Sequence, residues 1–147
     1  MKQRGFTLME LMIGVAIVAI LAVIAMPSFV QQIKQDRIVT QANQVQALYR
    51  FARSEAVKRD TSLQLKVVDG SWCVVESIAG KDVELRRFSL EHSSLSINLS
   101  AVSFDSSGGV SAPSNILITD NDTSTTDYRF CSLISGQSWL VAGAATC

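Results

Sequence analysis

Residues 5–10 read Gly-Phe-Thr-Leu-Met-Glu, and every residue from Leu11 to Met26 is apolar or glycine. A helix over Phe6–Met26 rises about 1.5 Å per residue, or about 31 Å in all, which is enough to cross the hydrocarbon core of a bilayer. Lys2 and Arg4 precede this stretch, and basic residues beside a membrane span stay in the cytoplasm. The sequence therefore predicts a single-pass membrane protein with a cytoplasmic N-terminus and an exported remainder.

Glu10 is the one ionisable side chain between Phe6 and Met26. A carboxylate near one end of a spanning helix is costly, so it indicates a function by default. An ordinary secretory signal would hold this charge inside its apolar core and would be cleaved after that core, where Ala22-Val23-Ile24-Ala25 is a poor small-x-small site. A plain single-pass anchor explains the length and orientation of the stretch but not Glu10.

These residues together resemble the N-terminus of a type IV prepilin or pseudopilin. The resemblance rests on a short basic leader that ends in Gly5, on Phe6 directly after it, on Glu10 as the fifth residue beyond that junction, and on the apolar stretch followed by Pro27. It implies that residues 1–5 are a leader peptide, that a prepilin peptidase cleaves between Gly5 and Phe6, and that the new amine of Phe6 is methylated. It also implies an assembly role for Glu10.

Pro27 should bend the helix without ending it, because proline removes one backbone donor and frees the carbonyl of Val23. The pattern predicts one helix over residues 6–59, with residues 6–26 as its transmembrane and assembly segment. A coiled-coil seam is the alternative, which the short, alanine-rich stripe disfavours. Apolar residues beyond Pro27 recur at steps of four and three, typical of a helix with one buried face: Ile38, Ala42, Val45, Tyr49, Ala52 and Ala56.

The sequence at the end of this helix indicates a particular branch of the pilin-like proteins. Residues 52–59 read Ala-Arg-Ser-Glu-Ala-Val-Lys-Arg, which resembles the GspH/FimT branch of minor pilins and pseudopilins. A Phe-x-x-x-Gly turn within 102–109 is a second, weaker likeness. Arg53 and Lys58 flank Glu55 on the helix surface, and we interpret them as a solvated charged face without a binding role.

After Asp60 the apolar residues alternate with a period of two, which predicts an antiparallel β-domain over residues 60–147. Turn signals such as Asp69-Gly70 separate the strand-like runs. The fold class is therefore α+β, a pilin-like long N-terminal α-helix packed on a C-terminal antiparallel β-domain. The expected strands cover 63–67, 72–78, 83–90, 95–99, 102–104, 116–119, 128–133 and 139–142.

Composition leaves room for one small globular domain after the helix. Removing Lys2 and Arg4 from the 13 basic side chains leaves 11, against 13 acidic ones, so the processed chain is mildly acidic. The segment from Asp105 to Cys147 has four acidic residues and one basic residue. This distribution is not typical of a nucleic-acid-binding surface.

Three cysteines, Cys73, Cys131 and Cys147, predict one disulfide and one free thiol in an exported protein. We prefer the pair Cys131–Cys147, which closes a short C-terminal loop and stabilises by about 3 kcal/mol in the chain-entropy model. Cys73 lies in a strand-like run and is expected to be a small buried hydrophobe. The other two pairings stay open.

The chain offers little for catalysis or metal binding, and we predict neither an enzyme nor a cofactor. The one histidine, His92, lies in a turn-like segment, and the cysteines lack the spacing of a zinc site. Residues 120–127 carry oxygens at alternate positions, as a calcium loop does. Thr125 replaces the required glycine and Cys131 the bidentate glutamate, so we predict a solvated loop.

DNA is a further candidate partner, because FimT-type relatives carry a basic Gly-Arg-x-Arg near the C-terminus for DNA uptake. The corresponding stretch here is Gly136-Gln137-Ser138-Trp139, which lacks both arginines. Trp139 could stack on a base, but a tryptophan in a strand is more often part of a core. The sequence therefore disfavours DNA as a partner.

The resemblance implies a minor pilin of a type IV pilus, held in the bacterial inner membrane before it joins the filament. Its partners would be other major and minor pilins, the prepilin peptidase and the inner-membrane assembly platform. In the filament, Glu10 would pair with the N-terminal ammonium of an adjacent subunit and so set the register. A type II secretion pseudopilin is the alternative in the same class, and a membrane-anchored ligand-binding module is the alternative in another.

Overall fold

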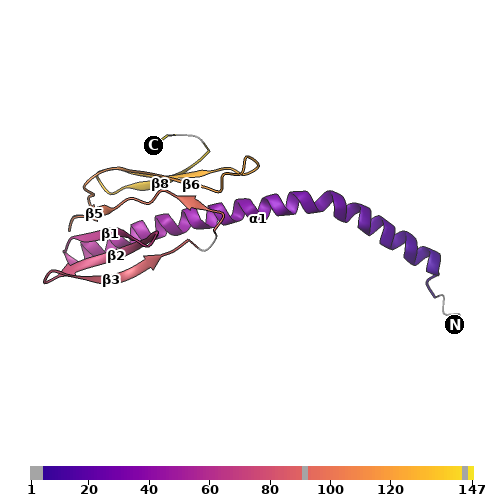
Figure 1. The fold of residues 1–147 in the computed structure, drawn as a ribbon, viewed down its shortest axis with the longest axis horizontal. Helices are drawn as coiled ribbons and strands as arrows, with labels where there is room; N and C mark the ends of the chain where they lie inside the picture. Colours follow the sequence, from indigo (N-terminus) through magenta and orange to yellow (C-terminus); the bar gives the residue numbers. More distant parts are fainter. Residues whose placement is uncertain (1–4, 91–92, 144–145) are drawn as a thin grey trace. The chain divides into compact units, whose positions relative to one another are not determined.

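The computed structural model describes residues 5–90, 93–143 and 146–147 (Figure 1). Contacts within the chain define two compact units, one that ends at Lys34 and one from Gln35 to Cys147. The α+β class is confirmed. The elements are α1 (Leu8–Arg59), β1 (Leu63–Val68), β2 (Ser71–Ile78), β3 (Lys81–Phe88), β4 (Ser96–Ile97), β5 (Val102–Phe104), β6 (Ser114–Thr119), β7 (Tyr128–Ser132) and β8 (Ser138–Ala142).

In the first unit, α1 begins at Leu8 and not at Phe6, because Thr7 caps it. The Thr7 hydroxyl accepts a hydrogen bond from the backbone N–H of Glu10 at 3.2 Å, and the Thr7 carbonyl accepts one from Leu11. A threonine at the N-cap satisfies a backbone donor that the first helical turn leaves unpaired. Pro27 lies inside α1, which continues through it. The bend at Pro27 stays a prediction.

In the second unit, the predicted stripe of α1 is its buried face. All six side chains of the stripe are completely inaccessible to solvent, and Gln41 and Leu48 are buried beside them. Seven of the large aliphatic and aromatic side chains on the two sheets are at most 1% exposed and complete the core: Leu63, Leu65, Trp72, Phe104, Ile116, Ile118 and Phe130.

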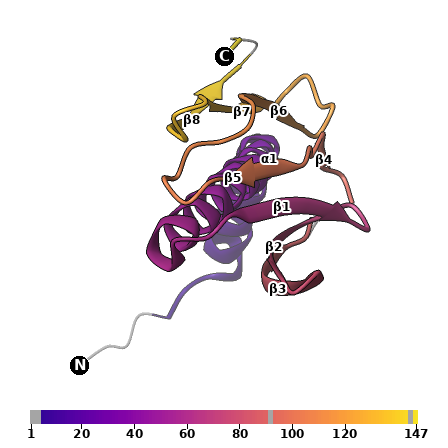
Figure 2. The ribbon, with the colours of Figure 1, turned by 90° about the vertical axis from the view of Figure 1, so that its left-hand side faces the viewer.

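The strands form two antiparallel sheets on this helix. Sheet A has the order β3-β2-β1-β5, and sheet B has the order β4-β6-β7-β8. Figure 2 shows sheet B, with β6, β7 and β8, above the end of α1, and sheet A beside it. The chain passes between the sheets three times, because it enters sheet B at β4, returns to sheet A at β5 and enters sheet B again at β6.

Four aromatic rings join the helix to both sheets. The ring of Tyr49 in α1 lies 4.9 Å from that of Phe104 in β5 and 5.0 Å from that of Phe130 in β7. Trp72 in β2 contacts Phe130 edge-on at 6.3 Å and donates its indole N–H to the carbonyl of Ser100 at 2.8 Å. Burial raises the pKa of the Tyr49 hydroxyl.

Arg53 holds two loops against the helix, so its interpretation as a solvated charge is wrong. Its Nε–H donates to the carbonyl of Gly108 at 2.8 Å, and its terminal nitrogen donates to the carbonyl of Ser135 at 3.2 Å. In the first loop, Asp105 accepts hydrogen bonds from the Ser107 hydroxyl and from the Gly109 N–H, and these hold its pKa below the ordinary value. These contacts have no local signal in the sequence, because they join segments 55 and 82 residues apart.

A disulfide joins Cys131 to Cys147, with the two Cα atoms 5.5 Å apart. This is the pair expected from the sequence. Cys73 is free and buried, as predicted, and burial raises the pKa of its thiol. The bond attaches the last residue of the chain to β7, at the centre of sheet B.

Gly136 should tolerate no side chain. Its φ is +79°, and a Cβ there would lie 2.0 Å from the carbonyl oxygen of Gly108. Gly70 is a matched control, with a φ of +71° and nothing within 4 Å of the added atom. In denaturant unfolding of the detergent-solubilised chain, Gly70→Ala should cost only the left-handed strain, about 1–2 kcal/mol. Gly136→Ala should cost about 1–3 kcal/mol more from overpacking. Equal losses would contradict the close packing of the two loops.

Reduction of the disulfide should destabilise the second unit. The chain-entropy model gives about 3 kcal/mol for a loop of this size. Thermal unfolding followed by near-ultraviolet circular dichroism should therefore shift to lower temperature when a reductant is added to the wild-type chain. The control is Cys131→Ala/Cys147→Ala, whose unfolding should be the same with and without reductant. A wild-type chain indifferent to reductant would show that the bond does not stabilise the fold.

Candidate functional site

The predicted processing site lies in an accessible segment that precedes α1. Gly5, Phe6 and Thr7 are exposed and outside the helix, and Phe6 is 81% exposed. No other atom lies within 4 Å of the position that a Cβ on Gly5 would take. Lys2 and Arg4 lie outside the described residues. The peptide bond between Gly5 and Phe6 is thus open to a protease, and the cap at Thr7 starts the helix two residues beyond it.

Glu10 lies in the first turn of α1, on the wall of an apolar hollow. The hollow has a volume of about 300 Å³ and is lined by Phe6, Glu10, Leu11, Gly14, Val15 and Val18. Its floor is open because nothing lies within 4 Å of the position of a Cβ on Gly14. No described residue pairs with the Glu10 carboxylate. The site therefore offers one carboxylate beside a shallow apolar surface, which a neighbouring helix could cover.

The apolar side chains around Glu10 have no cover within the first unit. Every large apolar side chain from Phe6 to Met26 is at least 53% exposed. By length and composition alone, α1 could cross a membrane, and its most apolar window has a mean hydropathy of 2.7. Exposed apolar surface of this extent is rare on soluble monomers and indicates contact with lipid or with other protein chains.

The structure bears on only part of the predictions about catalysis and metal binding. His92 lies outside the described residues. Across the residues that the structure describes, no group of three or more His, Cys, Asp or Glu side chains could hold a metal ion. In the 120–127 loop, Asp120 accepts hydrogen bonds from the Asp122 N–H and the Thr125 hydroxyl, so one of its oxygens is used to fold the loop.

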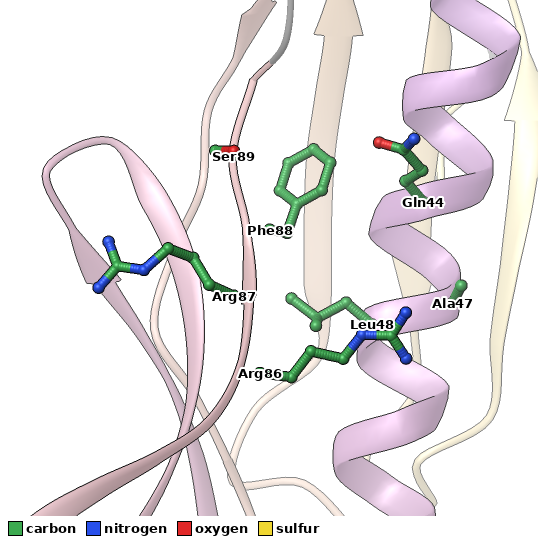
Figure 3. Close-up of a pocket in the computed structure, with 7 residues that line it drawn as sticks. All are labelled: Gln44, Ala47, Leu48, Arg86, Arg87, Phe88 and Ser89. Carbon is green, nitrogen blue, oxygen red and sulfur yellow. The ribbon is translucent and has the colours of Figure 1, made fainter.

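A small hollow between α1 and β3 contains two arginines that sequence reasoning did not single out (Figure 3). It measures about 260 Å³ and lies between Gln44, Ala47 and Leu48 on the helix and residues 86–89 at the end of β3. Figure 3 shows Arg86 reaching toward the helix and Arg87 pointing away from it. Arg86 stacks over the ring of Phe51 at 5.2 Å, and Arg87 pairs with Glu84 at 2.7 Å. Both arginines thus have partners within the domain.

Comparisons with known proteins cover both parts of the chain. A family model described as "Type II transport protein GspH" matches residues 41–140, and one described as "Prokaryotic N-terminal methylation motif" matches residues 1–26. The type IV major pilin protein PilA of Myxococcus xanthus is 41% identical over 59 residues, which are 40% of this chain and 27% of PilA. A fimbrial protein of Pseudomonas aeruginosa is 44% identical over 52 residues, which are 35% of this chain and 34% of that protein. The matched region spans about a third of these relatives' length or less.

Solved structures of a minor pilin have a fold similar to that of this chain. The type IV minor pilin FimU of Pseudomonas aeruginosa superposes with a TM-score of 0.66 at 14% identity, over 78% of this chain and 95% of FimU. A second crystal form of FimU gives a TM-score of 0.61 at 16% identity, over 74% of this chain and 95% of FimU. Because the GspH model covers more than half of the chain, the resemblance drawn from the sequence is confirmed. This chain belongs to the GspH family of type IV pilin-like proteins.

Proposed function

We propose that this protein is a minor pilin of a type IV pilus. The observation that carries the proposal is an exposed apolar helix segment whose one acidic residue, Glu10, lies in the first turn, a few residues beyond the exposed Gly5 and Phe6. The GspH family membership and the FimU-like fold support it. In this proposal the chain spans the inner membrane once, with its N-terminus in the cytoplasm, until the assembly platform extracts it into a filament.

The proposed mechanism has three steps. The prepilin peptidase cleaves after Gly5 and methylates the amine of Phe6, which remains a cation. The α1 segment then leaves the lipid and packs beside the helices of other major and minor pilins, so that protein contacts replace lipid contacts. In that apolar layer the Glu10 carboxylate pairs with the ammonium of a neighbouring subunit. An unpaired charge there would be costly, so the pair selects one register between the helices.

A type II secretion pseudopilin is the second candidate, and membership of a family described as a type II transport protein favours it. Both candidates share the cleavage, the anchor and the role of Glu10. They differ in the phenotype of a deletion strain: loss of surface pili with intact secretion supports the minor pilin. Loss of protein secretion with intact pili supports the pseudopilin and overturns our proposal.

The mature N-terminus should be N-methylphenylalanine at Phe6. Mass spectrometry of the chain purified from membranes of the source organism should find a first peptide that begins at Phe6 and carries one added methyl group. A strain without its prepilin peptidase is the control, and there the chain should keep Met1 or begin before Gly5. An intact leader in the wild-type strain would instead indicate a plain membrane anchor.

Glu10→Leu should leave membrane insertion intact and impair incorporation into filaments. Removing one partner of a buried ion pair costs about 3–5 kcal/mol, so the amount in sheared filaments should fall by more than about tenfold. Quantitative immunoblots of the membrane and filament fractions measure both effects. Glu10→Asp keeps the charge and is the matched control, which should recover part of the incorporation. Normal incorporation of Glu10→Leu would refute the assembly role of this carboxylate.

A further inference from the structure

The second unit has a broad hollow where the end of α1 meets the two loops that Arg53 holds. We call it the basic hollow. Its volume is about 770 Å³, larger than that of the hollow beside β3. The helix contributes Arg50, Arg53, Ser54, Val57 and Lys58, and the loops contribute Ser107, Gly136, Gln137 and Ser138.

Three of these lining residues are cationic and none is acidic. Arg50 is exposed, and neither it nor Arg53 forms an ion pair with any described residue. Lys58 lies 3.5 Å from Glu55, but the lysine side chain is 76% exposed, and Arg59 binds the same carboxylate at 2.8 Å. An exposed ion pair of this kind is weak and contributes little to stability. The lining of the hollow therefore carries an excess of positive charge.

Arg53 is positioned before any partner arrives. Its two hydrogen bonds are to carbonyl oxygens, which fix the guanidinium without cancelling its charge. A guanidinium has five N–H donors and these bonds use two, so donors remain for an acceptor from outside. A planar guanidinium held in this way suits a carboxylate, which can accept two parallel hydrogen bonds.

The apolar residues near the basic hollow favour a protein partner over a nucleic acid. Val57 in the lining is 50% exposed, and Leu133 and Ile134, in the loop that Arg53 holds at Ser135, are 46% and 64% exposed. Protein interfaces combine such apolar side chains with charged groups. A surface for single-stranded nucleic acid would instead need aromatic rings for stacking, and no aromatic residue lines the hollow.

We propose that the basic hollow docks a carboxylate-bearing loop of a neighbouring pilin subunit, an inference that rests on the proposed function. The chain itself shows what such a loop is like. Asp120, Asp122 and Asp127 lie between β6 and β7, whereas the Gly136–Ser138 wall of the hollow follows the other end of β7. A subunit with this layout presents carboxylates at one end of sheet B and cations at the other. Head-to-tail contacts between such ends extend a filament.

Site-specific photocrosslinking in assembled filaments tests this proposal. A photoreactive benzoylphenylalanine replaces Ser54, which is exposed and lines the hollow, and the same residue at Ser77 in β2 is the control site. After illumination, mass spectrometry should map the Ser54 adduct to a pilin segment with at least two carboxylates. Adding Arg50→Glu should lower the yield by roughly tenfold or more, because like charges are then opposed. Lys81→Glu, the same charge change at an exposed residue outside the hollow, should leave it unchanged.

Several results would overturn the proposal. They are an adduct with DNA, an adduct with a pilin segment that lacks carboxylates, no adduct from Ser54, or equal yields with Arg50→Glu and Lys81→Glu. In each case the chain is present in the filaments, so the proposed minor pilin function stands while the docking surface fails. A processed chain that never enters filaments would overturn both.

Discussion

The β-domain depends on one face of α1, which both sheets use to bury their apolar sides. Tyr49 lies at this junction, with its ring against Phe104 of sheet A and Phe130 of sheet B. Full burial of a large apolar side chain stabilises by about 1.5–3 kcal/mol, and such contacts recur along the stripe from Ile38 to Ala56. Because two short sheets share one helix, damage to this stripe would expose the inner faces of both.

The same helix has a different environment in the first unit, where it has no sheet to cover it. From Leu11 to Met26 the helix is apolar on all sides and its large side chains are exposed, which indicates contact with lipid or with other protein chains. In the proposed function, Glu10 favours the helices of other subunits over lipid, since a partner subunit can offer it a cation and the lipid core cannot. One continuous helix would thus combine a stable globular unit with a segment that is completed by assembly.

The local elements could be predicted from the sequence because their signals are local. The stripe of α1, all eight strands to within a few residues and the Cys131–Cys147 pair match the structure. The helix start differs because the Thr7 cap was overlooked, although a threonine three residues before a glutamate is a recognisable cap signal. The sequence did not indicate which strands join which sheet, nor that Arg53 binds two loops. Both depend on contacts between distant segments, and alternating apolar residues do not specify which strands pair.

Candidate processing and assembly residues were predicted from the sequence, since their signal is a charge and a glycine beside an apolar run. The basic hollow was not, because its cations come from one helix and its other wall from two separate loops. Gly136 shows the same limit. It follows β7 at a turn where a φ of +79° already favours glycine, but the close approach of the Gly108 carbonyl, which excludes any Cβ, depends on a distant segment.

The central claim is that the chain is complete only inside a filament. Peptide mass spectrometry of purified, sheared surface filaments tests it most directly, with an isotope-labelled peptide from the second unit as the quantitative standard. The account predicts that this chain is a constituent of filaments from the wild-type strain and is absent from the sheared fraction of a strain that makes no pili. A chain found only in the membrane fraction, while filaments form without it, would contradict the account.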